Sequence, residues 1–349
     1  MPSLYLNRLW KRGTEFLGVP YAILGGAMTW VSEAHLVSAI SEAGGFGILA
    51  SGSMPPDLLR QEIQKTRAMT AKPFGVNLIV LHPELEALAK ACIDEGVSHV
   101  VLAGGLPPKK IIEQLHEGGV KVIGFAPSLI LARKVVRLGA DALIIEGSEA
   151  GGHIGPISTS VLAQEILPYL TDIPVFVAGG IGRGDTVLAY LEMGAAGCQL
   201  GTRFVCATES IAHERFKQAF INAQARDATV SPQLDARFPV IPVRALSNDG
   251  TRRFLEVQRQ VIDRFNQGKL TQKEAQLEIE HFWAGALRRG VIEGDVEEGS
   301  LMAGQSVGLV TQIEPAASII QTLVEEMEQA LQKRNLLLKD AQPMKQLAS

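Results

Sequence analysis

One histidine stands in a glycine-rich segment that directly follows an apolar stretch. Residues 146–155 read EGSEAGGHIG. Glycine lets a flat cofactor come close to the backbone, and an imidazole beside that cofactor can move a proton near neutral pH. His153 is therefore the candidate catalytic residue, and the preceding Gly151 and Gly152 are candidate cofactor contacts.

Two other places combine unusual residues with an expected strand end. The run Gly25-Gly26-Ala27-Met28 offers bare backbone and a polarisable thioether, which together suit contact with a flat ring. A core position for the methionine explains it equally well. Asn77 interrupts an apolar strand, so its amide needs a partner, and we expect that partner to be a ligand.

Several other chemistries lack their sequence signatures. The chain has no HExxH segment, no paired His and Cys spacing and no nucleophile elbow, so we predict no metal site and no serine hydrolase. Glu146 and Glu149 lie close in sequence, but this spacing on a loop does not indicate a glycosidase. Cys92, Cys198 and Cys206 are expected to be reduced, buried thiols.

The elements that must position these residues alternate regularly. Short apolar runs recur about every 21 to 32 residues, the period of a βα unit. They begin near Tyr21, Phe46, Phe74, Ser98, Lys121, Ala142, Pro174 and Gly197. Helical patterns lie between them, the first following a serine cap at Ser32. The pattern predicts an α/β fold, a (β/α)8 TIM barrel, with an open doubly wound sheet as the alternative. Both folds place the chemistry at the carboxyl ends of the strands.

The last two predicted strands end in segments suited to a phosphate. In barrels the loops after strands seven and eight, with a short helix, commonly bind phosphate through backbone N–H groups. Here those segments contain Gly179, Gly180, Gly201 and Thr202, which we predict as cofactor contacts. Tight βα turns alone are the alternative explanation for these glycines.

The regular alternation of strand and helix patterns stops after Glu209. We expect residues 1–209 to form the barrel, 210–300 a smaller, mostly helical cap inserted after strand eight, and 301–349 a segment that returns to the barrel. The pattern of residues 306–333 predicts one amphipathic closing helix, and residues 338–349 are expected to fray.

Composition limits the partners. The net charge of −4 and pI near 6.0 argue against nucleic acid and anionic lipid. The longest uncharged run, residues 16–32, is too short and too rich in Gly and Pro to cross a membrane, and no secretory signal is visible. We therefore expect a cytoplasmic protein without membrane partners.

Taken together, several segments resemble the nitronate monooxygenase family, formerly called 2-nitropropane dioxygenase, which includes the FMN-dependent enoyl-acyl carrier protein reductase II. They are GGAMTWV (25–31), AGGFG (43–47), KPFGVN (72–77), EAGGHIG (149–155), AGGI (178–181), GTRF (201–204) and GSLMAGQ (299–305). The resemblance implies an FMN-bearing barrel with a helical cap, a homodimer, His153 in the position of the active-site histidine, and Glu146 and Gln305 as further FMN contacts.

The resemblance leaves two flavin reactions open. A nitronate monooxygenase would oxidise alkyl nitronates or nitroalkanes with O2 to carbonyl compounds and nitrite, with His153 as base. An enoyl-acyl carrier protein reductase would use NAD(P)H as co-substrate, and His153 would polarise the thioester carbonyl. We favour the first slightly. A phosphate-binding barrel without redox chemistry is the alternative from a different class.

The partner predictions follow from these alternatives. Either oxidoreductase acts on a small-molecule substrate, and only the reductase needs an acyl carrier protein. Such carriers are acidic and require a basic docking surface. The acidic chain offers scattered cations for one, although solvated helix faces explain them as well. They are Lys109, Lys110, Arg133, Lys134 and Arg137.

Overall fold

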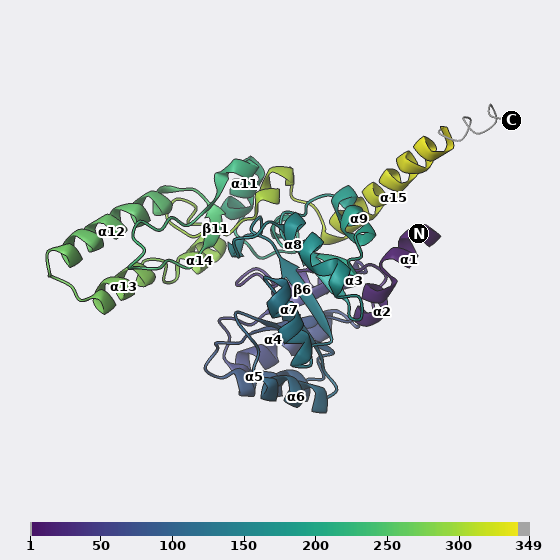
Figure 1. The fold of residues 1–349 in the computed structure, drawn as a ribbon, viewed down its shortest axis with the longest axis horizontal. Coiled ribbons are helices and arrows are strands. Elements are labelled where there is room, and N and C mark those ends of the chain that lie inside the picture. Colours follow the sequence, from purple (N-terminus) through teal and green to yellow (C-terminus); the bar gives the residue numbers. More distant parts are fainter. Residues whose placement is uncertain (1, 341–349) are drawn as a thin grey trace.

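The computed structural model describes residues 2–340, and its centre is a closed barrel of eight parallel strands (Figure 1). Neighbouring strands follow the order β1-β2-β3-β4-β5-β6-β8-β9. Their bounds are β1 (Ile23–Gly25), β2 (Phe46–Ala50), β3 (Gly75–Ile79), β4 (His99–Ala103), β5 (Lys121–Phe125), β6 (Ala142–Glu146), β8 (Val175–Ala178) and β9 (Gly197–Leu200). Closure between β1 and β9 confirms the predicted barrel and excludes the open sheet.

Alternation along the strands decides which side chains face the barrel interior. Leu24, Phe46, Ile144 and Phe176 belong to the interior core, whereas the residues beside them in sequence pack outward against the helices. By the same alternation, the inward-facing residues nearest the carboxyl ends of several strands are polar. The apolar interior core therefore stops short of the barrel mouth, and a layer of polar side chains lies above it.

Helices cover the outside of the barrel where the sequence predicts them. They are α3 (Ala34–Glu42), α4 (Pro56–Met69), α5 (Leu85–Asp94), α6 (Lys109–Glu117), α7 (Leu129–Arg137), α8 (Thr159–Ile166) with η1 (Leu167–Tyr169), α9 (Gly184–Glu192) and the one-turn α10 (Thr202–Val205). Each long helix buries one apolar face against the strands.

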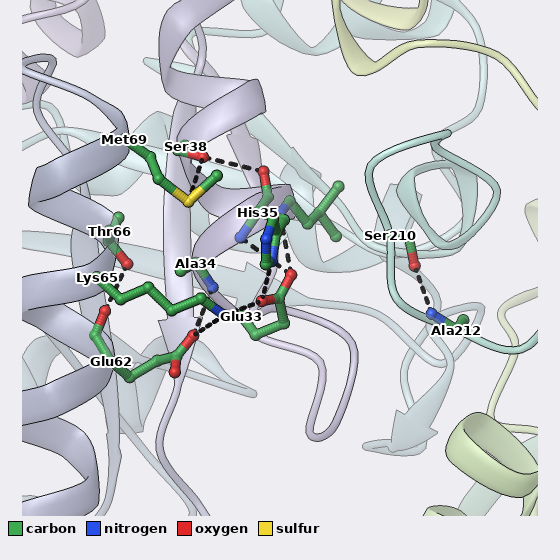
Figure 2. A network of polar contacts seen from close by, with 11 residues as sticks. Glu33, Ala34, His35, Ser38, Glu62, Lys65, Thr66, Met69, Ser210 and Ala212 are labelled. Carbon is green, nitrogen blue, oxygen red and sulfur yellow. Dashed lines mark hydrogen bonds and ion pairs between the residues drawn. The ribbon is translucent and has the colours of Figure 1, made fainter.

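The predicted serine cap of α3 is wrong. The side chain of Glu33 accepts hydrogen bonds from the amides of His35 and Leu36, and Figure 2 shows its carboxylate between His35 and Lys65. A carboxylate at this position also suits the positive end of the helix. The hydroxyl of Ser32 instead bonds the backbone of the preceding loop, accepting from the amide of Met28.

The amino-terminal end of the barrel is closed by α2 (Lys11–Leu17), and the preceding α1 (Leu4–Leu9) contacts the carboxyl-terminal helix through Tyr5 and Arg334. Phe16 lies against the His99 ring at 5.0 Å, and its carbonyl oxygen is 2.9 Å from His99 Nε2. Burial in this apolar floor lowers the pKa of His99 to about 4, so its ring is neutral. His99 is therefore part of the core and lies at the end opposite the mouth.

The segment after Glu209 builds a projection on one side of the mouth. It contains α11 (Glu214–Asn222), η2 (Ala225–Asp227), β10 (Ala228–Val230), β11 (Val243–Leu246), α12 (Asp249–Asn266), α13 (Gln272–His281), α14 (Ala286–Arg288) and η3 (Arg289–Glu293). In Figure 1, α12 and α13 lie side by side and extend away from the barrel. They enclose a separate small core that includes Phe238, Phe254 and Ile279.

The carboxyl-terminal helix begins later than predicted. Residues 306–333 are not one helix: η4 (Gln305–Leu309) is followed by an irregular stretch, and α15 starts at Ala316 and ends at Asp340. Pro315 cannot donate a helical hydrogen bond, and Glu314 pairs with Ala207 instead. Residues 341–349, most of the segment predicted to fray, lie outside the described residues. Within residues 2–340, no helix combines the length and apolarity that a membrane crossing needs.

Candidate functional site

Three polar side chains from different strands face the interior at the carboxyl end of the barrel. They are Asn77 on β3, Glu146 on β6 and Gln199 on β9. Asn77 and Gln199 are only 6% and 7% exposed, yet neither amide side chain hydrogen-bonds another described residue. The polar atoms of both amides stay accessible from the open mouth, because neither side chain is among the buried groups that lack a partner. This polar layer is therefore suited to a ligand that supplies the missing donors and acceptors.

Glu146 adds a carboxyl group to the same layer. Strand pairing aligns Glu146 with Ala178 on β8, and Ala178 with Gln199 on β9. Burial raises the pKa of Glu146 to about 8, so at neutral pH the group is protonated and can donate a hydrogen bond. Gln199 is a site residue that was not predicted, although it interrupts an apolar strand with a polar side chain as Asn77 does.

The glycine-rich end of β1 forms one wall of the mouth. The amide of Gly26 donates to the carbonyl oxygen of Leu200 at 2.8 Å, and a Cβ at Gly26 would lie 3.3 Å from the amide of Gln199. A Cβ at Gly201 would lie 3.4 Å from the sulfur of Met28. The structure thus brings these predicted contacts together, with Ala27 half-buried between them.

At Gly25, packing between α3 and β1 and not contact with a ligand explains the need for glycine. A Cβ at this position would lie 2.5 Å from Cδ1 of Ile40, so the absence of a side chain lets α3 pack closely on β1. Its missing side chain points toward the helix layer, and only its backbone can contribute to the mouth.

The loops after β8 and β9 present free backbone amides. Gly179 and Gly180 have φ values of 101° and 70°, which glycine adopts without strain. Among the described residues, the amides of Gly180 and Thr202 have no protein acceptor. Oγ1 of Thr202 accepts from the amide of Gly304 at 2.9 Å, which leaves its own proton to donate. These donors suit an anion, and α10 is too short to add a substantial helix dipole.

His153 lies in β7 (Gly152–His153), a two-residue strand that pairs with β11. His153 stands opposite Val243 in this pairing, and its ring is exposed at the edge of a cavity. The surrounding protein still desolvates the ring enough to lower its pKa, so the imidazole is neutral at pH 7. A neutral imidazole can accept a proton at one nitrogen and donate from the other.

The carboxyl-terminal segment supports the histidine loop. A Cβ at Gly151 would lie 2.6 Å from the amide nitrogen of Gly304, so only glycine fits there. The amide of Gln305 donates to the carbonyl oxygen of Glu149 at 2.9 Å. The Glu149 carboxylate accepts from the amide of Thr159 at the start of α8. Gln305 therefore reaches the predicted neighbourhood, and Glu149 stabilises the loop.

Arg244 on β11 holds the other side of the loop. It is 8% exposed, its Nε donates to the Ser148 carbonyl at 2.9 Å, and its Nη1 donates to the Ala228 carbonyl at 2.6 Å. One guanidinium thereby joins the histidine loop to β10. The sequence carried no signal for this role, because the two acceptors lie far from Arg244 along the chain.

An apolar cavity of about 320 Å³ opens beside His153. Strands β10 and β11, helices α12 to α14 and residues 299–302 surround it. Its apolar wall includes Val230, Pro239, Val240, Ile241, Ala245, Leu246, Phe254, Ile279, Trp283, Leu287, Leu301 and Met302. A volume of this size is typical of a small-molecule site, and the wall selects an apolar group. The cavity joins segments that are distant in sequence, so no local sequence pattern predicts it.

The family model of nitronate monooxygenase matches residues 11–92 and 85–326 of this chain. The chain belongs to the nitronate monooxygenase family. The match includes the barrel, the loop that contains His153 and most of the segment after β9.

Individual relatives agree with the family. FabK from Thermotoga maritima is 40% identical with a TM-score of 0.83, covering 93% of this chain and 98% of that chain. The (3aS,4S,5R,7aS)-5-hydroxy-7a-methyl-1-oxo-octahydro-1H-indene-4-carboxyl-CoA dehydrogenase of Mycobacterium tuberculosis is 32% identical over 93% of this chain and 98% of its own. A probable nitronate monooxygenase of Staphylococcus aureus strain JH9 is 29% identical over 93% and 99%.

This member of the nitronate monooxygenase family is an oxidoreductase. Within residues 2–340, no group of three or more His, Cys, Asp or Glu side chains could hold a metal ion. Cys92, Cys198 and Cys206 are buried and unpaired, and burial raises the pKa of each thiol. The thiols therefore belong to the core, as predicted.

Proposed function

We propose that the protein is an FMN-dependent oxidoreductase that reduces an α,β-unsaturated acyl thioester with NAD(P)H. The observation that carries this proposal is the apolar cavity that opens beside His153. An acyl group can fill such a cavity while its thioester stays at the histidine, whereas a nitroalkane of a few carbons would leave most of the apolar wall without contact.

The residues at the mouth fit FMN. The free amides of Gly180 and Thr202 would hold its phosphate, and the unpartnered amides of Asn77 and Gln199 would bond the ring system. Glu146 is protonated at neutral pH and can donate to a ring acceptor. Bound FMN would supply the hydride chemistry between nicotinamide and substrate.

His153 and the cavity would bind and polarise the acyl thioester. A neutral imidazole can donate its N–H to the thioester carbonyl, where negative charge grows during hydride addition to the β carbon. The apolar wall orients the acyl group and excludes water from that hydrogen bond. In this mechanism His153 polarises the substrate without changing its own charge, and the α carbon takes the proton that completes the reduction from solvent.

Two comparisons support thioester chemistry. The M. tuberculosis relative is named as a carboxyl-CoA dehydrogenase, and a coenzyme A ester of a carboxylic acid is a thioester. The likeness to FabK fits the reductase alternative. Both are more similar to this chain than the S. aureus relative is.

Nitronate oxidation, the alternative slightly favoured by the sequence, is the second candidate. The match to the family model and the likeness to the S. aureus protein support it. His153 also suits it, because its lowered pKa keeps the ring neutral and able to accept a proton from a nitroalkane. The apolar cavity is the observation that places it second.

Anaerobic stopped-flow reduction separates the candidates. The FMN-loaded protein is mixed in parallel with NADH, NADPH and ethylnitronate, and the reduced protein is then mixed with a trans-2-enoyl thioester. We expect fast reduction by a pyridine nucleotide and fast reoxidation by the thioester. Reduction by nitronate alone, with nitrite released in air, would reverse the order of the two candidates. A protein that gains no FMN on reconstitution would favour the phosphate barrel without redox chemistry.

The remaining predictions belong with this proposal. The boundaries 1–209, 210–300 and 301–349, the homodimer and the cytoplasmic location stay predictions from sequence. Light scattering after gel filtration of the FMN-loaded protein would measure the number of subunits directly.

A further inference from the structure

The outer face of α7 is cationic and has no compensating acid on its own helix. Arg133, Lys134 and Arg137 are exposed, residues 129–137 contain no Asp or Glu, and none of the three cations forms an ion pair with a described side chain. Glu165 is the acidic residue on the adjacent helix α8, and it too remains unpaired with them. An acidic protein therefore retains one local positive surface.

The other predicted cations behave differently. Lys109 is 2.9 Å from Glu113 on the same helix, and Lys110 is 2.8 Å from Glu86 on α5, so a neighbouring carboxylate neutralises each lysine. The structure thus divides the five candidates from the sequence into two neutralised lysines on α6 and three uncompensated cations on α7.

Exposed apolar side chains accompany the α7 cations. Ile130 is 79% exposed in the first turn of α7, Val161 is 51% exposed in α8, and Tyr169 is 63% exposed in η1. The guanidinium of Arg133 lies 5.9 Å from the ring centre of Tyr169. We call these three residues with Arg133, Lys134 and Arg137 the α7 surface. Exposed aliphatic and aromatic groups among Arg side chains are typical of protein interfaces.

One end of the α7 surface adjoins the candidate site, and the rest extends along the side of the barrel. The first turn of α7 follows the carboxyl end of β5, so Ile130 lies at the barrel mouth. In the connecting loop, Cβ of Pro127 lies 3.8 Å from the position of a Cβ at Gly155, two residues after His153. A partner seated on α7 would therefore have a short path to the histidine.

We propose that the α7 surface docks an acidic carrier protein that holds the acyl thioester on a flexible prosthetic arm. The proposal rests on the proposed function. Charge complementarity selects an acidic partner, and the exposed apolar groups supply the contact that a highly charged small molecule would not use. A second copy of this chain would bring like charges together in a symmetric contact. The positive area is also too small for nucleic acid.

Steady-state kinetics with one acyl chain on two carriers tests this docking. The same trans-2-enoyl chain is presented on acyl carrier protein and on coenzyme A, to wild type and to R133E/K134E. We expect KM for the protein-borne substrate to rise at least 10-fold in the variant, with kcat and the coenzyme A kinetics unchanged. The wild-type KM should also rise with salt, and the variant KM should not.

The matched control is K269E/K273E, which reverses two exposed cap lysines that form no ion pair with a described residue. It changes the net charge equally and should leave both KM values unchanged. Ile130→Glu tests the apolar part of the surface, and at 79% exposure the residue tolerates the change without loss of folding. Equal effects on both carriers, or an effect of the cap control, would overturn the docking site.

A binding measurement keeps the docking proposal separate from the proposed function. Fluorescence anisotropy of labelled acyl carrier protein reports its affinity for wild type and R133E/K134E without turnover. Weaker binding to the variant supports the α7 surface even if no enoyl thioester is reduced, and that result would count only against the reaction. Equal binding to both proteins overturns the surface.

Discussion

His153 is fixed through its backbone and not through its ring. Strand pairing with Val243 and the bond from the amide of Ile154 to the Pro242 carbonyl hold the main chain, while the ring has no side-chain hydrogen bond to a described residue. Both ring nitrogens therefore remain available for substrate. This arrangement suits a group that polarises or deprotonates a ligand, because no internal partner must be broken first.

Replacing His153 by alanine should retain FMN and slow turnover by roughly 100-fold or more. The cofactor contacts we propose lie on other strands. Because burial lowers the pKa of His153, wild-type kcat/KM should be flat above pH 6.5 and rise at lower pH, where the protonated ring is a stronger donor to the thioester carbonyl. The variant should lose this acid limb. His281→Ala, an exposed cap histidine, is the control. Near-normal turnover of His153→Ala would contradict the assignment.

Glu146 should make the flavin-free protein less stable as pH rises. Burial raises its pKa from 4.5 to about 8, so the folded state binds the proton more tightly than the unfolded state. The stabilisation is complete below pH 4.5 and is lost progressively up to about pH 8. Glu146→Gln removes this dependence, which amounts to at most about 5 kcal/mol. Tm measured for both proteins from pH 5 to 9 checks it, and parallel curves would show that the carboxyl is not desolvated.

At the residue scale, local sequence carries a signal where a polar residue interrupts an apolar strand. Asn77 is identifiable in this way, and its contact with a ligand stays a prediction. Gln199 carries the same signal. It was not predicted because the interpretation of this segment rested on Gly201 and Thr202, which follow it. Gly25 was assigned to the cofactor, but its contact with Ile40 depends on helix packing that no local pattern reports.

At the scale of elements, the three-stranded sheet β10-β11-β7 connects the histidine loop to the cap. Substituting Arg244 by alanine would remove the donors to the Ser148 and Ala228 carbonyls and loosen this connection. We expect kcat to fall by roughly 10-fold to 100-fold, since small displacements of a catalytic group are costly. FMN affinity should be unchanged.

Three measurements distinguish this positioning role from a general loss of stability. Arg244→Lys keeps the charge but not the two-pronged donor geometry, so it should recover little of kcat. Arg226→Ala, with a side chain that is 80% exposed, should have no effect. The acid limb of the pH profile should persist in Arg244→Ala because His153 remains present. Full activity of that variant would refute the role.

The cap cavity should set the length of the acyl group. Ala245 lies in its wall, and Ala245→Phe would occupy part of the about 320 Å³ volume. We expect kcat/KM to fall at least 10-fold for long enoyl chains and to stay close to wild type for a crotonyl thioester. A series of chain lengths measures this, and the crotonyl substrate serves as internal control. An equal loss for every chain length would place the acyl group elsewhere.

Elements with a regular period were predictable, and elements that depend on distant partners were not. The eight barrel strands follow a repeat that the chain displays directly. Strand β7 has two residues and exists because β11 pairs with it, so no local pattern could reveal it. The closing helix was placed too early because its apolar pattern continues through η4, where Pro315 and the pairing of Glu314 interrupt the helix.

The whole molecule combines cores of unequal size. The barrel and its helices contain the large apolar clusters. Helices α12 and α13, which project from the barrel in Figure 1, rely on a small separate cluster that includes Phe238, Val261 and Ile279. Burying less apolar surface gives a smaller free energy of local opening. The cap should therefore open without the barrel, which would let an acyl chain enter the cavity.

Hydrogen exchange measured by mass spectrometry tests this difference in stability. Peptides from α12 and α13 should exchange faster than peptides from β3 and β4 in the flavin-free protein. FMN should slow the loops after β8 and β9 and leave α12 nearly unchanged, because the proposed phosphate site lies on the barrel. A non-reducible acyl thioester added next should slow α12 and β11, whose residues line the cavity. If the acyl ligand protected only the barrel loops, the cap cavity would not be its binding site, and the reason for preferring thioester reduction over nitronate oxidation would disappear.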